Sequence, residues 1–388
     1  MLRLLHTADV HLGARHADLG EQAAAQRERQ FAAFTATIDL AIRERVDVVL
    51  IAGDLFDSNT QPRRSVERVA AQLERLVAAR IRTVVIPGTH DVYDRSSIYR
   101  AYDLKAMASS TPDDDFVTVL TPDVGEVHLR ACDAIVYATV FPTKRAPRSP
   151  LEGVSVAADR RATWRVGMVH GAIAIPGRTD GDDVVVTKEQ IAATGLDFLA
   201  LGHWHSTQHG KAGPVMFAYA GAPEPIALDQ DRAGKALLVT LEEVSGARSV
   251  SIEERVVGRT TFDKVEVDAA TIRTQADLAR QLAARADPDL VLDVRIVGVR
   301  PDQLDLNPDE IEGQLRPSFL KVRVRDASLP ALTEGAIPSA ETVVGAFIRD
   351  VEGRIAELEA GSQGAEAGEL RDALRLGRLL LAGHEVAL

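Results

Sequence analysis

The sequence contains very little cysteine: Cys132 is the only one in 388 residues. A single thiol cannot form a bridge within the chain, so a fold stapled by internal disulfides is excluded. Sparse cysteine is typical of proteins from reducing compartments, and we therefore expect a cytoplasmic location. The length exceeds the roughly 250–300 residues at which one hydrophobic core stops growing, so two domains are expected.

Long apolar runs are also absent from the sequence. No stretch approaches the roughly 20 apolar residues that span a bilayer, so we expect no membrane association. The apolar run at the beginning is short and soon gives way to polar residues, whereas a signal peptide needs a longer one. The composition, with 46% hydrophobic and 26% charged residues, favours an ordinary globular protein.

Aromatic residues make up only 4% of the chain, and the formal net charge is −12. Few rings leave little material for stacking nucleobases, and the negative charge argues against nucleic-acid binding through the overall field of the protein. A local groove stays open, because bound metal ions would add positive charge. Basic residues in loops beside the motifs described below are candidates for phosphate contacts, with a solvated loop as the alternative. They are Arg15, Arg63, Arg64, Lys144, Arg145 and Arg148.

Short β-branched runs alternate with amphipathic stretches through the first two thirds of the chain. Phe31, Phe34, Ile38 and Ile42 recur at helical spacing, and a second helix is predicted over 65–79. The early β-α-β-α-β order predicts a layered α/β fold. The predicted strands are 3–7, 47–52, 83–87, 135–140, 165–169, 198–201, 215–219 and 237–241.

The character of the sequence changes near Gly258. Beyond it, strands over 264–267, 290–297 and 320–324 and a helix over 274–286 predict a small α+β domain. A helical tail follows Pro338, with apolar faces at Val343–Val351 and Leu370–Leu381 and a flexible joint over 360–368. The predicted domains are therefore 1–258, 259–337 and 338–388.

Five polar motifs follow one another along the first domain, and most come directly after a β-rich run. The carboxyl ends of strands in an open α/β sheet are where ligands collect, so we expect these side chains to meet. The motifs are Asp9-Val10-His11, Gly53-Asp54, Gly88-Thr89-His90-Asp91, His170-Gly171 and Gly202-His203-Trp204-His205.

These residue types suit a pair of divalent metal ions. Such a centre needs a bridging carboxylate, terminal imidazole and carboxylate ligands, and an open edge. Asp9 and His11 are two apart, so in an extended chain both point the same way, and His203 and His205 repeat that spacing. Asp54 follows a glycine that allows a turn at a strand end. Mixed imidazole and carboxylate ligands favour manganese, iron or zinc. A single histidine is more often a core or surface residue, but five ordered motifs argue against that alternative.

The motif order resembles the calcineurin-like metallophosphoesterase superfamily, whose signature is Asp-x-His, Gly-Asp, Gly-Asn-His-Asp, His and Gly-His-x-His. Within it, the segments 6–13 (His-Thr-Ala-Asp-Val-His-Leu-Gly) and 52–57 (Ala-Gly-Asp-Leu-Phe-Asp) resemble the DNA-repair nucleases of the SbcD and YhaO type. The segment 221–225 (Gly-Ala-Pro-Glu-Pro) is similar to a Gly-Ser-Pro-Glu segment of that group. The resemblance covers roughly the first 240 residues.

The resemblance implies a four-layer α/β/β/α sandwich followed by a capping domain. It implies that the enzyme cuts DNA phosphodiester bonds, from an end, with two divalent ions, as Mn²⁺. His90 would be the catalytic histidine over the scissile phosphate, and Asp91 would orient it. One ion would be held by Asp9, His11, Asp54 and His205, and the other by Asp54, His170 and His203.

Thr89 departs from the family pattern, which has asparagine at this position as a ligand of the second ion. A threonine hydroxyl sits on a shorter, branched stem, so a looser second site and lower activity are expected. Two alternatives to a DNA nuclease stay open: a phosphodiesterase or phosphatase that acts on another phosphoester, and a catalytically weakened scaffold subunit.

The resemblance also implies partners. SbcD-type nucleases work with an SMC-like ATPase, and the helical tail is compatible with docking on its coiled coil or with packing on the capping domain. Family members often form homodimers through the phosphoesterase domain. DNA is the implied substrate.

Overall fold

Residues Leu2–Thr7 form β1, the first strand in this computed structural model. The structure describes residues 1–16, 23–109, 115–146, 148–175, 184–227, 230–301, 304–330, 339–361 and 363–381. The chain divides into two units, Met1–Thr261 and Phe262–Leu388. The three-part division at 258 and 337 stays a prediction, and its second boundary lies outside the described residues. Within the described part of the chain, no helix has the length and apolar character needed to cross a membrane.

The first sheet of the first unit has four parallel strands, β1 to β4, and an antiparallel hairpin along one side. Strand β2 is buried along its whole length, as expected for a parallel strand covered on both faces. In spatial order the strands are β14 (Ala247–Val256), β13 (Lys235–Val244), β1 (Leu2–Thr7), β2 (Val48–Ala52), β3 (Arg82–Ile86) and β4 (Val117–Val119).

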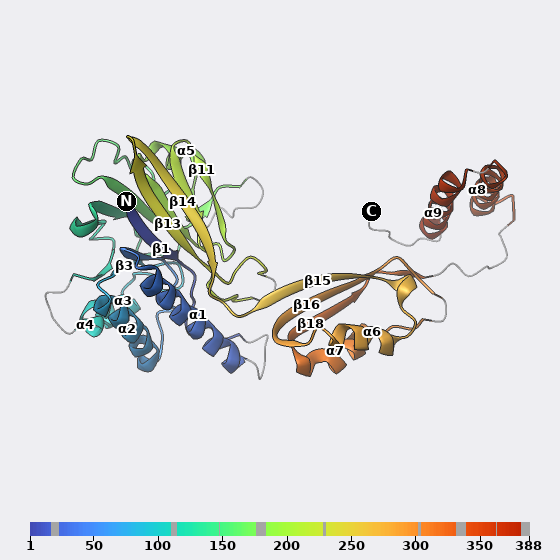
Figure 1. Cartoon of the computed structure of the whole chain (residues 1–388), viewed down its shortest axis with the longest axis horizontal. Coiled ribbons are helices and arrows are strands. Elements are labelled where there is room, and N and C mark those ends of the chain that lie inside the picture. The colour runs from blue at the N-terminus through green and yellow to red at the C-terminus, as the bar shows by residue number, and fades with distance from the viewer. Residues whose placement is uncertain are drawn as a thin grey trace. The chain divides into compact units, whose positions relative to one another are not determined.

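Helices α1 (Ala23–Glu44) and α2 (Arg63–Ala78) cover the outer face of this sheet (Figure 1). Phe34, Ile38 and Val66 lie in one apolar cluster with side chains of β1, β2 and β3. The helical spacing of apolar residues in the sequence marks these buried faces. Two short helices, α3 (Ile98–Ala101) and α4 (Leu104–Ala108), follow the loop after β3.

The second sheet packs its inner face against the first, with Leu4 and Val48 in the same cluster as Val166 and Phe198. Helix α5 (Lys188–Ala193) covers its outer face, where Ile191 is buried against β7 and β10. In spatial order the strands are β11 (Gln208–Ala212), β12 (Val215–Tyr219), β10 (Phe198–Gly202), β7 (Trp164–His170), β6 (Ala134–Ala138) and β5 (Glu126–Leu129). A short ladder pairs β8 (Ala172–Ile173) with β9 (Val185–Val186).

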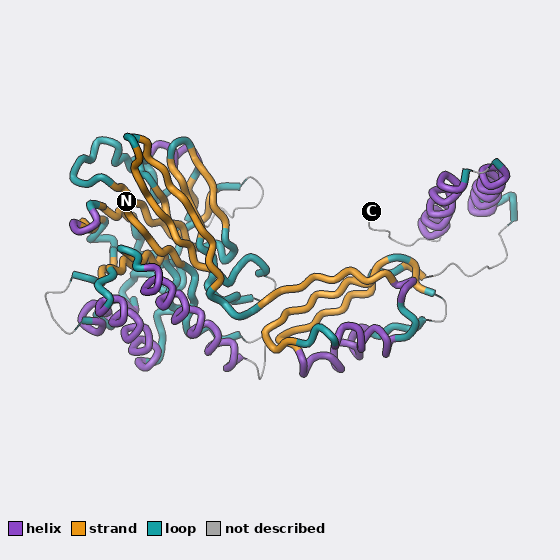
Figure 2. Tube along the Cα trace, viewed as in Figure 1, coloured by secondary structure: helices purple, strands orange, loops and turns teal. Residues whose placement is uncertain are grey.

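The first unit is thus a four-layer α/β/β/α sandwich, which confirms the predicted fold class (Figure 2). Each of the eight predicted strands is present. The unpredicted strands of this unit are β4, β5, β8, β9, β11 and β14. Strand β14 lies at a sheet edge, and only Val250, Ile252 and Arg255 of its ten residues are even half-buried, so it lacks the apolar signal of an interior strand.

The second unit contains a three-stranded sheet backed by two helices. Leu278 of α6 and Ile311 of α7 share a core with Leu292, Val294 and Val324 of the sheet. The elements are β15 (Thr261–Asp268), α6 (Gln275–Ala283), β16 (Asp287–Val297), α7 (Pro308–Leu315) and β18 (Phe319–Asp326), with a short pair of β17 (Val299–Arg300) and β19 (Leu329–Pro330). Helix α7 was not predicted.

Two further helices, α8 (Val343–Ala360) and α9 (Gly364–Leu381), pack against each other. Leu370 and Leu374 pack against α8, whereas the sequence left open a coiled coil or the capping domain as the surface that covers this face. A Cβ added at Gly377 would lie 2.2 Å from the ring of Phe347, which explains a glycine inside this helix. The predicted joint over 360–368 is too long, because its alanine and glutamate residues favour helix and α9 begins at Gly364.

Candidate metal centre

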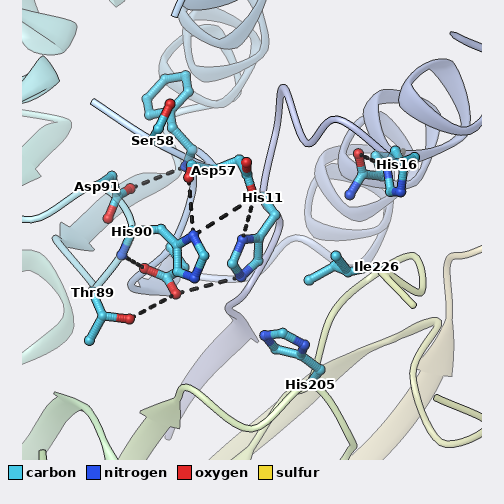
Figure 3. A network of polar contacts seen from close by, with 12 residues as sticks. His11, His16, Asp57, Ser58, Thr89, His90, Asp91, His205 and Ile226 are labelled. Atoms are coloured by element: carbon cyan, nitrogen blue, oxygen red, sulfur yellow. Dashed lines mark hydrogen bonds and ion pairs between the residues drawn. The ribbon is translucent and has the colours of Figure 1, made fainter. Parts of the chain in front are cut away.

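The predicted ligands lie at neighbouring carboxyl ends of strands from both sheets. Asp9 and His11 follow β1, Asp54 follows β2, and Thr89 and His90 follow β3. From the second sheet, His170 is the last residue of β7, and His203 and His205 follow β10. Figure 3 shows His11, Thr89, His90 and His205 turned toward one region, with His16 apart from them.

The backbone at these positions is held in a rare conformation. Asp9, His11 and Asp54 have φ of 52°, 48° and 51°, and His203 has φ of 101°. Left-handed backbone costs a non-glycine residue about 1–3 kcal/mol and gathers at functional sites. The extended Asp9-x-His11 geometry expected from the sequence is therefore wrong, since β1 ends at Thr7 and a tight turn presents both side chains.

Two neighbouring turns support each other through backbone hydrogen bonds. The N–H groups of Asp9 and His11 donate to the carbonyl oxygens of Gly53 and Asp54, at 3.1 and 2.9 Å. Gly53 has φ of 90°, and a Cβ there would lie 2.2 Å from Nδ1 of His170. Only glycine allows this backbone and this close approach of the imidazole.

Ligand atoms of the described residues group into three overlapping sets, one of which joins His11 to Asp57 and His90, while the other two share Asp9. Atoms of Asp9, His11 and His205 lie within 4.8 Å of one another, and so do atoms of Asp9, Asp54 and His170. Oδ2 of Asp54 lies 3.5 Å from Nε2 of His11 and 3.2 Å from Nε2 of His170. Asp54 therefore stands between an imidazole of each sheet, where a bridging ligand is needed.

His203 is placed by its backbone as well as by its ring. Its N–H donates to the two carboxylate oxygens of Asp9, at 2.9 and 3.2 Å. Its ring meets that of His170 edge-on, with centroids 5.5 Å apart. The second set thus contains Asp9 where the resemblance implies His203, which lies beside it.

The pKa values of the buried carboxylates and of His170 show how the cluster balances its charge. Burial raises the pKa of Asp9 to about 6. Burial would raise the pKa of Asp54 too, but the positive charge of His170 holds it well below its usual range. Burial would lower the pKa of His170, but Asp54 and Asp9 outweigh it and raise that pKa to about 10. The cluster thus balances its buried carboxylates with a proton on an imidazole.

The residues fit divalent cations. Nε2 of His11 and Nε2 of His170 are buried and make no hydrogen bond of good geometry with any described residue. Both point at Asp54, and two carboxylates lie beside them with nearly no exposed surface. Buried imidazole nitrogens and carboxylates aimed at one point are the donor set of Zn²⁺, Mn²⁺ or Fe²⁺.

The sequence profile of the calcineurin-like phosphoesterase family matches residues 2–207. The chain belongs to this family. Members of this family use divalent metal ions to hydrolyse phosphoesters, and the cluster is a candidate site for such ions.

Several relatives of this phosphoesterase are named for DNA repair. The DNA double-strand break repair protein Mre11 of Aeropyrum pernix is 28% identical over 283 residues, covering 69% of this chain and 64% of its own length. Mre11 of Halobacterium salinarum is 26% identical, covering 84% and 78%. The uncharacterized metallophosphoesterase YhaO of Bacillus subtilis is 29% identical, covering 57% and 52%. The chain therefore matches less than two thirds of the length of the Aeropyrum and Bacillus relatives.

Among the candidate site histidines, His90 is the exposed one, with a side chain that is 48% accessible. Its backbone N–H donates to Oδ1 of Asp54 at 2.8 Å. Its Nδ1 lies 3.0 Å from the carbonyl oxygen of Asp57, which can only accept, so Nδ1 carries a hydrogen. The ring of His11 is edge-on to it, at 4.5 Å between centroids.

Asp57 was not predicted as a site residue. Its Oδ1 lies 3.1 Å from Nδ1 of His11, so the carboxylate orients that imidazole and leaves Nε2 for a metal ion. The same residue holds His90 through its carbonyl group. The signal was present, since a carboxylate three residues after Asp54 falls on the loop that faces the first motif.

Asp91 does not hold the His90 ring through any contact that the structure shows. Its buried carboxylate accepts hydrogen bonds from the N–H of Gly88 at 2.7 Å, the N–H of Phe56 at 3.1 Å and the hydroxyl of Tyr99 at 2.6 Å. It therefore fixes the loop after β3 and connects it to the loop after β2. The orienting role implied for Asp91 falls to Asp57 instead.

Thr89 lies beside the candidate bridging ligand. Its hydroxyl is 3.5 Å from Oδ2 of Asp54, at the outer limit of a hydrogen bond. An asparagine at this position would carry a carbonyl oxygen one bond further from the backbone. The threonine hydroxyl instead points its hydrogen toward the carboxylate of Asp54.

The remaining histidines near the motifs have other contacts. His16 is buried against Oε1 of Gln30 at 2.9 Å, and His209 lies on β11 near Glu254. Trp204 stacks on Tyr219 with centroids 4.7 Å apart, so it packs behind the site.

Proposed function

We propose that this phosphoesterase is a metal-dependent DNA repair nuclease that hydrolyses phosphodiester bonds from an end. The observation that carries the proposal is the pair of overlapping ligand sets around Asp9 and Asp54, with the exposed His90 at their edge. Asp9, His11, Asp54, His170, His203 and His205 would hold two divalent ions, as Mn²⁺, with Thr89 beside the second. When bound, the ions supply the positive charge that a phosphodiester needs to accept a nucleophile.

His90 supplies the proton chemistry. Because the Asp57 carbonyl oxygen holds a hydrogen on Nδ1, Nε2 is the atom that gains or loses the second proton, and when the ring is protonated its Nε2–H can pass that proton to the leaving oxygen. Asp91 keeps the loop in place through Gly88, so that the ring stays beside Asp54. Proton transfer by a positioned side chain contributes about 10²–10⁴-fold to rate.

A basic pocket supports a nucleic-acid substrate. It has a volume of about 530 Å³ and lies next to the loop that follows His11. Arg15, Arg27, Arg64 and Arg68 line it against one carboxylate, Glu28, to which Arg68 is paired. Exposed guanidinium groups beside the centre suit a phosphate backbone and give salt-dependent binding. Relatives named as DNA double-strand break repair proteins point to the same substrate.

The test is Mn²⁺-dependent digestion of end-labelled DNA by the purified protein, His90→Ala and Thr89→Asn. We expect digestion by the wild type, a loss of about 10²–10⁴-fold in His90→Ala, and a gain in Thr89→Asn. Internal labels compared with end labels separate exonuclease from endonuclease. Intact DNA with all three proteins, under conditions where Mn²⁺ binding is measured directly, would rule out an autonomous DNA nuclease.

A second candidate is a weakened phosphodiesterase that acts on smaller esters. The observation that favours it is Thr89, whose hydroxyl turns to Asp54 in place of an amide oxygen. Parallel assays on cyclic nucleotides and bis(4-nitrophenyl) phosphate distinguish the two. Hydrolysis of these without DNA cleavage favours the second candidate, and Mn²⁺ binding without any hydrolysis favours a scaffold role.

The partner assignments belong to the same proposal. We propose that the α8–α9 pair docks on a coiled coil of an SMC-like ATPase, supported by the exposed Val343, Leu380 and Leu381 on this pair. A homodimer through the first unit is the second assignment. Co-purification with the ATPase, and light scattering of the chain alone, test them separately.

A further inference from the structure

Gln230 contacts the ring of His205 through its side-chain amide. Its side-chain oxygen accepts hydrogen bonds from the backbone N–H groups of Ile226 and Ala227, at 3.1 and 3.3 Å. Its nitrogen Nε2 lies 2.8 Å from Nδ1 of His205. Figure 3 shows His205 and Ile226 on the same side of His11, away from His90.

The two backbone contacts fix which way the amide faces. Backbone N–H groups only donate, so the atom that faces Ile226 and Ala227 must be the oxygen. The NH₂ group of Gln230 therefore faces His205, and an amide NH₂ group also only donates. Nδ1 of His205 must accept, so the single hydrogen of the neutral ring sits on Nε2.

This arrangement opposes metal binding. A neutral histidine binds a metal ion through a ring nitrogen that carries no hydrogen, and its other nitrogen then donates to an oxygen. Binding through Nε2 would place an N–H on Nδ1 against the N–H of Gln230. Binding through Nδ1 would displace the amide. Either route loses the 2.8 Å hydrogen bond.

We propose that Gln230 is a positioning residue that sets the tautomer of His205 and so weakens the metal position formed with Asp9 and His11. The first sheet shows the opposite arrangement, since the carboxylate of Asp57 accepts from Nδ1 of His11. The inference rests on the proposed ligand role of His205. It requires no particular substrate.

The deciding variant is Gln230→Glu, which keeps the shape of the side chain. One carboxylate oxygen can accept from Ile226 and Ala227 and the other from an N–H on Nδ1 of His205. Gln190→Glu is the matched control, because it adds the same charge at a capping position of α5 where glutamate serves as well. Gln230→Met removes both donor and acceptor at similar volume.

The first readout is the nitrogen NMR spectrum of histidine-labelled, metal-free protein, with the His205 signal assigned by its absence in His205→Gln. We expect the hydrogen on Nε2 in the wild type and in Gln190→Glu, and on Nδ1 in Gln230→Glu. The second readout is calorimetric titration with Mn²⁺ alone. We expect binding at least about 10-fold tighter in Gln230→Glu, the size of effect typical of groups behind a metal ligand.

Three results would overturn the inference. One is a hydrogen on Nδ1 of His205 in the metal-free wild type. Another is equal Mn²⁺ affinity in Gln230→Glu and Gln190→Glu. The third is weaker binding in Gln230→Met than in the wild type, because the loss of a mere structural contact would act in that direction. Neither readout involves DNA, so the inference can hold where the nuclease proposal fails.

Discussion

The two sheets of the first unit contribute unequal halves of the candidate centre. The first sheet supplies both buried carboxylates, Asp9 and Asp54, together with His11, and these residues expose 2% of their surface or less. The second sheet supplies only imidazoles, and His203 and His205 are half-buried. The carboxylates that give the site its negative charge therefore come from the first sheet, and the second sheet adds only imidazoles beside them.

The difference extends to how the side chains are held. On the first sheet, the turns after β1 and β2 hydrogen-bond to each other through the backbone, and Asp57 orients His11. On the second sheet, the carbonyl oxygen of His205 accepts from the N–H of Ala222 at 3.0 Å, but the His205 ring is contacted by the side chain of Gln230. A network of backbone bonds moves less than one side chain, so we expect the first half to be preformed and the second to adjust when a cation binds.

The largest effect should come from the carboxylate that faces both sheets. Asp54→Asn keeps the shape but removes the charge next to His11 and His170. We expect Mn²⁺ affinity to fall by more than about 100-fold, beyond the loss typical of groups behind a ligand. His203→Gln, on the second sheet, should cost less. Titration calorimetry of both variants measures this, and equal losses would break the comparison between the sheets.

The contact between the sheets gives the next effect. A Cβ at Gly202 would lie 2.0 Å from the carbonyl oxygen of Ala52 and 2.8 Å from Nδ1 of His170. Neither neighbour is the end of a flexible chain, so Gly202→Ala should lower the free energy of unfolding by about 2–3 kcal/mol. Gly313→Ala, in α7 with open space around it, is the control and should be neutral or stabilising. Urea unfolding of both variants tests this, and a Gly202→Ala protein as stable as the wild type would contradict the close approach.

The orienting carboxylate of the first sheet gives a smaller effect. Asp57→Asn keeps the backbone carbonyl that holds His90 but weakens the contact with Nδ1 of His11. We expect Mn²⁺ affinity to fall by about 10–100-fold. Arg161 makes exposed ion pairs at another surface of the sandwich, so Arg161→Gln should leave affinity unchanged. Unaltered affinity in Asp57→Asn would mean that the backbone alone positions His11.

Much of this centre follows from the sequence, because strand patterns and motif order place polar residues at strand ends. The four layers follow as well, since Phe34, Ile38 and the buried strand β2 carry strong apolar signals. The turns at Asp9 and Asp54 did not follow, because left-handed backbone depends on tertiary hydrogen bonds. Gln230 did not follow either, since its contact with His205 joins residues 25 apart through a loop without periodic pattern.

The dependence of metal binding on pH tests the comparison between the sheets. In the metal-free protein, a proton on His170 of the second sheet balances the negative charge of Asp54 and Asp9 on the first sheet. Asp54 and Asp9 raise the pKa of His170 from 6.5 to about 10, so the ring is protonated in the metal-free protein at pH 7. A protonated imidazole cannot bind a cation, so binding must release that proton. Mn²⁺ affinity should therefore rise about 10-fold per pH unit between pH 6.5 and 8.

Raising the pH has the opposite effect on the stability of the metal-free fold, which should fall. Because the pKa of His170 is raised on folding, its pairing with Asp54 stabilises the metal-free fold fully below pH 6.5, and this contribution is lost as pH rises toward 10. Below pH 6, protonation of Asp9 should weaken Mn²⁺ binding further, because its pKa is about 6. Calorimetry in two buffers of different ionisation enthalpy counts the protons released. No release at pH 7 would mean that His170 is neutral before binding, and that the second sheet carries no charge for the cation to replace.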